Sequence, residues 1–329
     1  MKKILIIRFS SIGDIVLTTP VIRAVKSQLD CTLHMLTKTA FAGIVKNNPH
    51  VDKVYSFTAS VREVIQGLQS ENYDFIIDLQ KNIRSVITRK ALGVPSSSFP
   101  KLNMEKWMLV NMKVNRMPDL HVVDRYFAAA EPLGISPDGE GLDYFIPEAD
   151  QVIPEKAHPM LQGGYVGVVI GGKHNTKILP GEKVAEIIKA LNYPVVLLGG
   201  EADRERGNRI TKLSNHEKVF NACGKFNLNQ SASLVKQARV IISNDTGLMH
   251  IAAAFRKPVI SIWGNTTPVF GMYPFMPAEE DLSVISEVKG LRCRPCSKLG
   301  YRQCPKKHFK CMMEQDTDYI VSQAKKFIT

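Results

Sequence analysis

RVIISNDTGLMHIAAAFRKPVISIWG, residues 239–264, carries the clearest structural signal in the chain: a strand, a helix and a second strand. Both strands are apolar runs without alternation, which is typical of parallel strands covered on both faces. The same order of strand and helix repeats from YVGVVIGG at residue 165 onward. This repetition predicts a Rossmann-like domain, in which helices cover both faces of a parallel sheet.

The first half of the chain has a similar pattern, which starts with the apolar run KKILIIRF at Lys2 and a helix expected over Ile15–Leu29. Residues 141–164 contain three prolines and no helical period, which indicates a connector. We therefore expect an α/β protein of two Rossmann-like domains whose parallel sheets face a central cleft. The expected division is an N-terminal domain over 1–150, a linker over 151–164, a C-terminal domain over 165–315 and a C-terminal helix over 316–329.

The composition is that of a globular protein, with 44% apolar and 22% charged among 329 residues, and the net charge is +12. Seven cations and no acid lie between Arg292 and Lys310. Such a field favours an anionic partner: nucleic acid, a phosphorylated small molecule or an anionic membrane surface. Prolines break the longest uncharged run, Pro258–Ala278, and Arg8 ends the first apolar run early. We therefore expect a cytoplasmic protein without a membrane span or a signal peptide.

The turn that opens the helix within residues 239–264 has the features of an anion site. Asp245 can cap the helix, and Thr246 and Gly247 then present backbone N–H groups where the helix dipole attracts a phosphate. His250 follows Thr246 by four residues, so both lie on one helix face, and its imidazole can donate to a phosphate oxygen. The alternative is a capped helix with a buried histidine. The sequence Asn-Asp-Thr-Gly between a strand and a helix favours the anion site.

Three further residues follow strands in the same half of the chain. Lys177, just before Pro180, suits a pyrophosphate counter-charge, although a solvated loop lysine would look the same. Glu201, after VVLLGG, can accept hydrogen bonds from a ribose or cap the next helix. Phe226 can stack on a base or belong to the core. Because parallel strands end at one edge of the sheet, these residues together predict a nucleotide site.

The first strand of the chain ends in a comparable turn. Ser10, Ser11 and Gly13 form this turn, and Asp14 lies at the start of the following helix. The helix N-terminus favours an ionised carboxylate, as a general base requires. Such a carboxylate can take the proton of a sugar hydroxyl late in a glycosyl transfer. A simple helix cap is the alternative for Asp14.

Four segments together resemble the ADP-heptose:lipopolysaccharide heptosyltransferase family over nearly the whole chain: MKKILIIRFSSIGDIVLTTPVIRAVK, HVVDRY at 121–126, Lys177 with Pro180, and ISNDTGLMHIAAAFRKPVISIWGNTTP. The resemblance implies the GT-B fold and an inverting glycosyltransferase that moves heptose from ADP-heptose to a lipid A–core acceptor in lipopolysaccharide biosynthesis. It implies an ADP-sugar donor bound by the C-terminal domain, an anionic lipid-linked acceptor met by the N-terminal domain, and no required cofactor or catalytic metal. It also implies peripheral contact with the inner face of the inner membrane and no nucleic-acid partner.

The resemblance assigns roles to individual residues by motif. Asp14 resembles the catalytic base, Lys177 the phosphate contact and Glu201 the ribose contact. The residues that resemble the loop for the donor sugar and pyrophosphate are Asp245, Thr246, Gly247 and His250. The turn before Asp14 would then belong to the acceptor side. Two short stretches depart from the family pattern, which leaves the sugar of the donor open: residues 171–173, where some members have hydroxyl residues, and residues 178–179, where members often have an aromatic residue before the proline.

Two other functions fit parts of the sequence. One is a GT-B-like sugar-nucleotide epimerase, which would turn over a sugar nucleotide without an acceptor. The other is a zinc-containing nucleic-acid-binding protein, which the basic charge and a cluster of cysteines favour. The cluster consists of Cys293, Cys296, Cys304 and Cys311. It resembles a zinc knuckle but lacks a second CxxC, so reduced thiols or a disulfide are equally open.

Residues 101–117, KLNMEKWMLVNMKVNRM, interleave basic residues with Met and Trp. This pattern suits a lip that touches anionic lipid. A loop that packs back on its own domain is the alternative.

Overall fold

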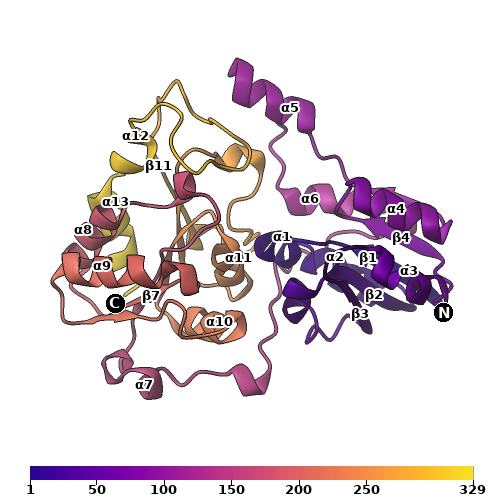
Figure 1. Ribbon diagram of the computed structural model, residues 1–329, viewed down its shortest axis with the longest axis horizontal. Helices are drawn as coiled ribbons and strands as arrows, with labels where there is room; N and C mark the ends of the chain where they lie inside the picture. The colour runs from indigo at the N-terminus through magenta and orange to yellow at the C-terminus, as the bar shows by residue number, and fades with distance from the viewer. Residues whose placement is uncertain (329) are drawn as a thin grey trace. The chain divides into compact units, whose positions relative to one another are not determined.

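The computed structural model describes residues 1–328 and divides into two compact units (Figure 1). Unit 1 consists of Met1–Leu102 and Leu120–Phe145, and unit 2 consists of Asn103–Asp119 and Ile146–Thr329. Residues 103–119 thus pack with unit 2 and not with the domain in which the sequence placed them. Residues 151–164 also belong to unit 2, because Val152 N donates to Ser233 Oγ (3.0 Å) and Leu161 is buried.

Unit 1 contains a five-stranded parallel sheet of order β3-β2-β1-β4-β5. Its strands are β1 (Lys2–Ile7), β2 (Cys31–Lys38), β3 (Lys53–Phe57), β4 (Phe75–Asp78) and β5 (Ser96–Ser98). Its α-helices are α1 (Ile12–Val16), α2 (Thr19–Gln28), α3 (Arg62–Gln69), α4 (Ile83–Leu92) and α6 (Val122–Phe127). The apolar residues at the centre of β1, from Ile4 to Ile7, are all completely buried. This is the burial expected of a central strand with helices on both faces.

The helix expected over Ile15–Leu29 is two helices, α1 and α2. Pro20 lies in the first turn of α2. Proline has no N–H to donate to the preceding turn, so it ends a helix before it but is tolerated at the start of a new one. The break leaves α1 as a single short turn of helix directly after β1.

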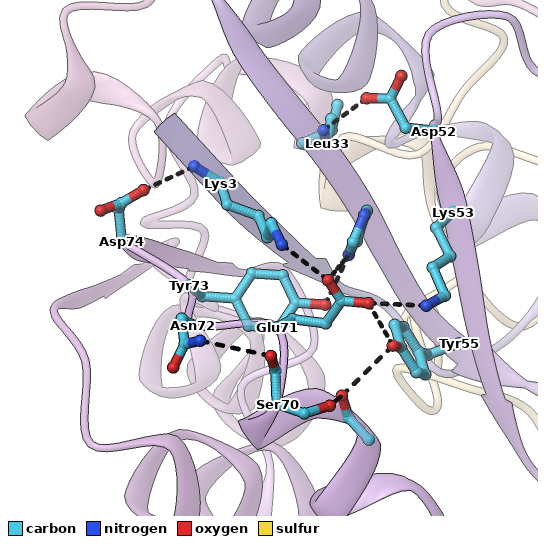
Figure 2. A network of polar contacts seen from close by, with 12 residues as sticks. Lys3, Leu33, Asp52, Lys53, Tyr55, Ser70, Glu71, Asn72, Tyr73 and Asp74 are labelled. Carbon is cyan, nitrogen blue, oxygen red and sulfur yellow. Dashed lines mark hydrogen bonds and ion pairs between the residues drawn. The ribbon is translucent and has the colours of Figure 1, made fainter. Parts of the chain in front are cut away.

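A network of charged and phenolic side chains joins the amino ends of the strands in unit 1 (Figure 2). The Glu71 carboxylate accepts hydrogen bonds from Lys3 Nζ (2.8 Å), Lys53 Nζ (2.7 Å) and Tyr55 OH (2.5 Å). Next to it, His34 Nδ1 lies 2.8 Å from Tyr73 OH. The network connects β1, β2 and β3 to the segment before β4, at the edge of the sheet opposite the carboxyl ends of the strands.

Unit 2 contains a six-stranded parallel sheet of order β11-β10-β9-β6-β7-β8. Its strands are β6 (Val166–Val169), β7 (Val195–Leu198), β8 (Val219–Asn221), β9 (Val240–Asn244), β10 (Val259–Trp263) and β11 (Ser283–Glu287). Its longer helices are α8 (Gly181–Leu191), α9 (Arg204–Ser214), α10 (Leu228–Gln237), α11 (Gly247–Ala254) and α13 (Thr317–Lys325). The shorter ones are α5 (Asn103–Trp107), which continues as a π-helix over Met108–Met112, α7 (Pro154–Ala157) and α12 (Lys310–Met313).

Helices cover both faces of the sheet in unit 2. Within this unit, Figure 1 shows α8, α9 and α13 on one face and α10 and α11 on the other. Every residue of β6, β9 and β10 is buried as a result. Among the described residues, no helix has the length and apolar character needed to cross a bilayer.

Candidate functional site

In both sheets the strand order reverses at one point. In unit 1 the chain builds outward from β1 to β2 and β3, and then from β4 to β5 on the other side. Unit 2 repeats this order with β6, β7 and β8 on one side and β9, β10 and β11 on the other. Open α/β sheets bind ligands where the direction of winding changes, at the carboxyl ends of the two central strands. Ligand sites are therefore expected at the carboxyl ends of β1 and β4 in unit 1, and of β6 and β9 in unit 2.

In unit 2 this position holds an ion pair between two of the residues predicted from the sequence. Lys177, after β6, places its Nζ 2.5 Å from Oδ2 of Asp245, after β9. Thr266, after β10, donates its hydroxyl to the same oxygen at 3.1 Å. The side chains of Lys177 and Asp245 are only 18% and 11% exposed. The ends of three neighbouring strands, β6, β9 and β10, therefore bring together one cation and its two partners in a partly buried position.

Asn244, the last residue of β9, holds the lysine loop in place. Its Nδ2 donates to Val169 O of β6 (3.1 Å), and its Oδ1 accepts from Leu179 N (3.0 Å). The side chain is buried and its contacts are satisfied, so removing it would leave buried backbone groups without partners. Asn244 thus fixes the segment that carries Lys177 against the end of β9.

The start of α11 differs from the expectation in one detail. Thr246, and not Asp245, is the N-cap residue, and no side chain caps the helix. The Asp245 carboxylate bonds Lys177 instead, which is why it is unavailable as a cap. The first N–H groups of a helix that lacks a side-chain cap are suited to an anion, and Gly247 provides the first of them. His250 is the fourth residue of this helix and is 2% exposed.

Glu201 follows β7, which pairs with β6, and Phe226 follows β8, which pairs with β7. Glu201 is paired with Arg204 Nη2 at 2.5 Å, and its side chain is 68% exposed. Phe226 is half-buried and meets the Phe220 ring nearly edge-on, with 6.4 Å between centroids. Gly224 makes room for Glu201, because a Cβ at Gly224 would lie 2.3 Å from the Glu201 carboxylate. Both residues lie at the same edge of the sheet as the Lys177–Asp245 pair.

In unit 1 the corresponding position also holds an ion pair. Arg8 Nη2 lies 2.5 Å from Asp14 Oδ1, and Ser11 donates to Asp14 Oδ2 from its N–H (3.0 Å) and its hydroxyl (2.8 Å). The Ser10 carbonyl accepts from Arg8 Nε, and Gly13 is buried within α1. Because α1 has only five residues, its dipole is small. The positive partner of Asp14 is Arg8, the cation that ends the first apolar run, and it is not among the site residues predicted from the sequence.

Arg8 is firmly held. Its guanidinium donates to Leu79 O, after β4, at 2.5 Å and lies 5.6 Å from the centre of the Tyr126 ring. Burial acts to lower the pKa of Arg8, but the neighbouring Asp14, Tyr126 and Asp78 outweigh it and the pKa is raised. Burial raises the pKa of Tyr126 to about 12, so its phenol is neutral. At neutral pH the cation therefore persists beside Asp14.

Lys101 lies in this part of unit 1. Burial lowers its pKa, and the charge of Arg8 acts in the same direction. It therefore belongs to the surroundings of the Arg8–Asp14 pair and not to the segment 103–119 with which the sequence grouped it.

A loop between β11 and α12 supports the Lys177–Asp245 pair from both sides. Arg294 donates to Thr266 O and to Glu287 Oε2, each at 2.8 Å. Tyr301 N donates to the hydroxyl of Thr176, the neighbour of Lys177, at 2.8 Å. The loop therefore fixes the residue before Lys177 and the residue that bonds Asp245. Neither residue is predicted for this role from the sequence: Thr266 lies within the last of the four segments that resemble the family, and Arg294 is one of the seven cations between Arg292 and Lys310.

The cysteines of the same loop do not form a ligand set. Within residues 1–328, no three His, Cys, Asp or Glu side chains are placed to hold a metal ion, and all six cysteines are free thiols. Cys293 Sγ lies 3.8 Å from His308 Nε2. Burial raises the pKa of Cys296 to about 11, which keeps this thiol protonated at neutral pH. The zinc knuckle considered from the sequence therefore finds no support in the arrangement of these residues.

Comparison with known proteins assigns the chain to a family. The sequence profile of glycosyltransferase family 9 (heptosyltransferase) matches residues 61–306. Lipopolysaccharide heptosyltransferase 1 of Campylobacter coli is 26% identical over 291 residues, which cover 80% of this chain and 84% of the relative.

Two solved structures share the fold. The structure of E. coli ADP-heptose lps heptosyltransferase II has a TM-score of 0.71 at 20% identity and covers 100% of this chain and 98% of its own. E. coli heptosyltransferase WaaC with ADP has a TM-score of 0.70 at 20% identity and covers 98% of this chain and 99% of its own. The α/β architecture expected from the sequence, with two parallel sheets of the GT-B type, is confirmed.

The family match supports neither the epimerase nor the zinc-containing nucleic-acid-binding protein. It spans well over half of the chain and includes every strand of unit 2. The protein is thus a glycosyltransferase and belongs to glycosyltransferase family 9, the heptosyltransferases.

Proposed function

We propose that the protein transfers heptose from ADP-heptose to a lipid A–core acceptor in lipopolysaccharide biosynthesis. The observation that carries the proposal is the Lys177–Asp245 pair beside the uncapped start of α11, because a cation and a helix N-terminus together suit a pyrophosphate. Relatives named as lipopolysaccharide heptosyltransferases, and a structural relative solved with ADP, support heptose, ADP and a lipid-linked acceptor as the reacting groups.

The transfer needs a base for the acceptor hydroxyl. In our proposal its oxygen attacks the anomeric carbon while the bond from that carbon to the phosphate oxygen breaks, so ADP leaves with the bonding electrons and the configuration inverts. The hydroxyl proton passes to Asp14 of unit 1. Each carboxylate oxygen has two lone pairs, so the contacts with Arg8 and Ser11 do not prevent Asp14 from accepting a proton. A base requires the carboxylate form, and an aspartate paired with an arginine is suited to this role.

Unit 2 would hold the donor and stabilise the departing ADP. Lys177, His250 and the first N–H groups of α11 are suited to the negative charge that grows on the pyrophosphate. Glu201 would accept hydrogen bonds from the ribose, and Phe226 would stack on the adenine. Lys177 and the N–H groups of α11 supply the positive charge for which other transferases use a metal. We therefore propose that the reaction requires no metal ion or other cofactor.

We further propose that the protein works as a peripheral protein at the inner face of the inner membrane. The acceptor in this reaction is an anionic lipid, so the enzyme has to reach its substrate at a bilayer surface. The excess of positive charge in the chain suits such a surface and such an acceptor.

The test is a transfer assay with purified protein, a heptose-free lipid A–core acceptor and a panel of nucleotide sugars, run in the presence of EDTA. We expect the acceptor to gain the mass of one heptose with ADP-heptose alone, and ADP to raise the melting temperature. Turnover of the sugar nucleotide without an acceptor would contradict transfer and favour an epimerase. Loss of activity in EDTA that added metal restores would contradict the metal-free mechanism.

A further inference from the structure

The loop between β11 and α12 exposes a large group of unpaired cations. No acidic residue occurs from 288 to 313. Five exposed cations of this loop take part in none of the ion pairs formed within residues 1–328: Arg292, Lys298, Arg302, Lys306 and Lys307. Leu299 and Tyr301 lie among them and are 65% and 39% exposed.

The helical segment 103–112, which is α5 with its π-helical continuation, exposes apolar side chains instead. Met104, Trp107 and Met112 are 65%, 52% and 55% exposed. Only Leu109 of this segment is buried. Large apolar groups that remain so exposed on adjacent turns mark a surface that meets an apolar partner.

A lysine joins the two segments. Lys113, directly after the π-helix, donates its Nζ to Cys293 O (3.2 Å) and to Pro295 O (2.7 Å). Both carbonyls belong to the loop between β11 and α12. This loop and the helical segment 103–112 are both parts of unit 2. Tyr301 OH donates to Cys296 O (3.0 Å), which ties the part of the loop around Tyr301 to the part that Lys113 contacts. We call the exposed residues of segments 103–112 and 292–307 the basic–apolar surface.

We propose that the basic–apolar surface binds the face of a bilayer rich in anionic phospholipid. Cations without acidic neighbours are attracted to anionic headgroups, and Trp and Met side chains insert at the boundary between headgroups and acyl chains. A nucleic acid would satisfy the cations but not the exposed Met104, Trp107 and Met112. The inference rests on the proposed function in one respect, namely that the acceptor is a membrane lipid.

The test is sedimentation of the full chain with vesicles of phosphatidylglycerol and phosphatidylcholine, and with vesicles of phosphatidylcholine alone. Binding is expected only to the anionic vesicles and should weaken with salt. At about fivefold per cation, the triple variant Arg302→Gln, Lys306→Gln, Lys307→Gln should bind on the order of 100-fold more weakly. Trp107→Ser should bind about tenfold more weakly, because it removes an apolar insertion.

Matched controls lie elsewhere on unit 2. Lys189→Gln, Lys212→Gln, Lys218→Gln removes three exposed cations, and Leu213→Ser removes an apolar side chain that is 47% exposed. Both controls should bind vesicles like the unmodified protein. Equal binding by the surface variants and their controls would overturn the proposal, as would preferential binding of the unmodified protein to a DNA duplex.

A water-soluble, deacylated acceptor separates this inference from the proposed function. The surface variants should transfer heptose to that acceptor at the normal rate, and to the same acceptor in vesicles at a reduced rate. If the unmodified protein binds anionic vesicles but transfers nothing to either acceptor, the proposed function fails and the surface stands. If the unmodified protein transfers heptose to both acceptors while the surface variants bind vesicles and react there normally, the proposed role of the basic–apolar surface is refuted and the proposed function stands.

Discussion

Lys177 Nζ lies 2.5 Å from Asp245 Oδ2, so the cation we assign to the donor pyrophosphate already has a carboxylate partner. A lysine side chain loses considerable rotamer freedom when a ligand immobilises it. Here Asp245 and the loop around Arg294 have fixed the position of the ammonium group before any phosphate arrives. Preorganisation of this kind improves affinity by lowering the entropic cost of binding.

Replacing Lys177 tests its role directly. Lys177→Ala should lower ADP affinity by about tenfold to 100-fold, the usual value of a hydrogen bond to a charged group. It should also lower stability, because it leaves the Asp245 carboxylate without its cation. Isothermal titration calorimetry measures the affinity. Lys183→Ala is the control, because Lys183 is 21% exposed and also paired with an acid, Glu186. Similar losses in both variants would argue against a phosphate contact at Lys177.

Arg294 should matter for both stability and donor binding. Arg294→Lys cannot reproduce the contacts to Thr266, Val288 and Glu287 together, so the free energy of unfolding should fall by about 1–3 kcal/mol. Because Thr266 bonds Asp245, ADP affinity should fall as well. Urea unfolding and calorimetry measure the two effects. Arg292→Lys, exposed in the same loop, should change neither; an Arg294→Lys variant that is destabilised but binds ADP normally would refute the support role.

Gly224 makes room for the carboxylate assigned to the ribose. Gly224 has φ +70°, and a Cβ there would lie 2.3 Å from Glu201 Oε2 and 2.9 Å from Glu201 Cα. Gly224→Ala should therefore displace Glu201 and weaken ADP binding. Gly290→Ala is the matched control, since Gly290 has φ +75° and a Cβ added to it would meet no atom within 4 Å. Both variants should lose about 1 kcal/mol of stability to the left-handed backbone. Gly224→Ala should lose more than this because its Cβ also meets the backbone of Glu201, and only this variant should bind ADP more weakly.

The network in Figure 2 should make the stability of unit 1 depend on pH. Hydrogen bonds from Lys3, Lys53 and Tyr55 hold the pKa of Glu71 well below its usual range. The unfolded chain therefore takes up a proton at Glu71 at a higher pH than the folded protein does. The stabilisation is present above the ordinary glutamate pKa of about 4.3 and is lost as the pH falls below it.

Glu71→Gln removes this dependence. The difference in free energy of unfolding between the unmodified protein and Glu71→Gln should be largest near neutral pH and should shrink below about pH 4. Denaturant unfolding across this range measures it. Glu131→Gln, at an exposed position of unit 1, should give a difference close to zero throughout. A Glu71→Gln difference that stays constant with pH would show that the network does not stabilise the fold in this way.

The central strands could be predicted from the sequence because they are uninterrupted apolar runs, and the strand, helix and strand expected within residues 239–264 are β9, α11 and β10. The edge strand β5 could not, because it consists of three serines. The site residues after β6 and β9 could be located because strand ends share an edge. The residues that pair with the predicted site residues could not be located from the sequence. Arg8 looks like a charge that merely ends a strand, and its contact with Asp14 requires the chain to turn back through α1.

Other errors have similar causes. A helix broken at Pro20 keeps the periodicity of a continuous helix, so the pattern did not show where α1 ends. The position of residues 103–119 depends on Lys113 reaching the carbonyls of Cys293 and Pro295, which are distant in sequence. Asp245 was expected to cap α11 because Asp is a good cap, but tertiary contact with Lys177 takes its carboxylate.

The central claim is that Asp14 removes the proton of the acceptor while unit 2 binds the donor independently. The most direct measurement is the rate of heptose transfer by Asp14→Asn, together with its ADP affinity. Asp138→Asn is the control, because Asp14 and Asp138 are both 24% exposed and both paired with an arginine. We predict that Asp14→Asn transfers heptose at least about 100-fold more slowly with unchanged ADP affinity, whereas Asp138→Asn stays near normal. Transfer by Asp14→Asn at the rate of the control would contradict the account.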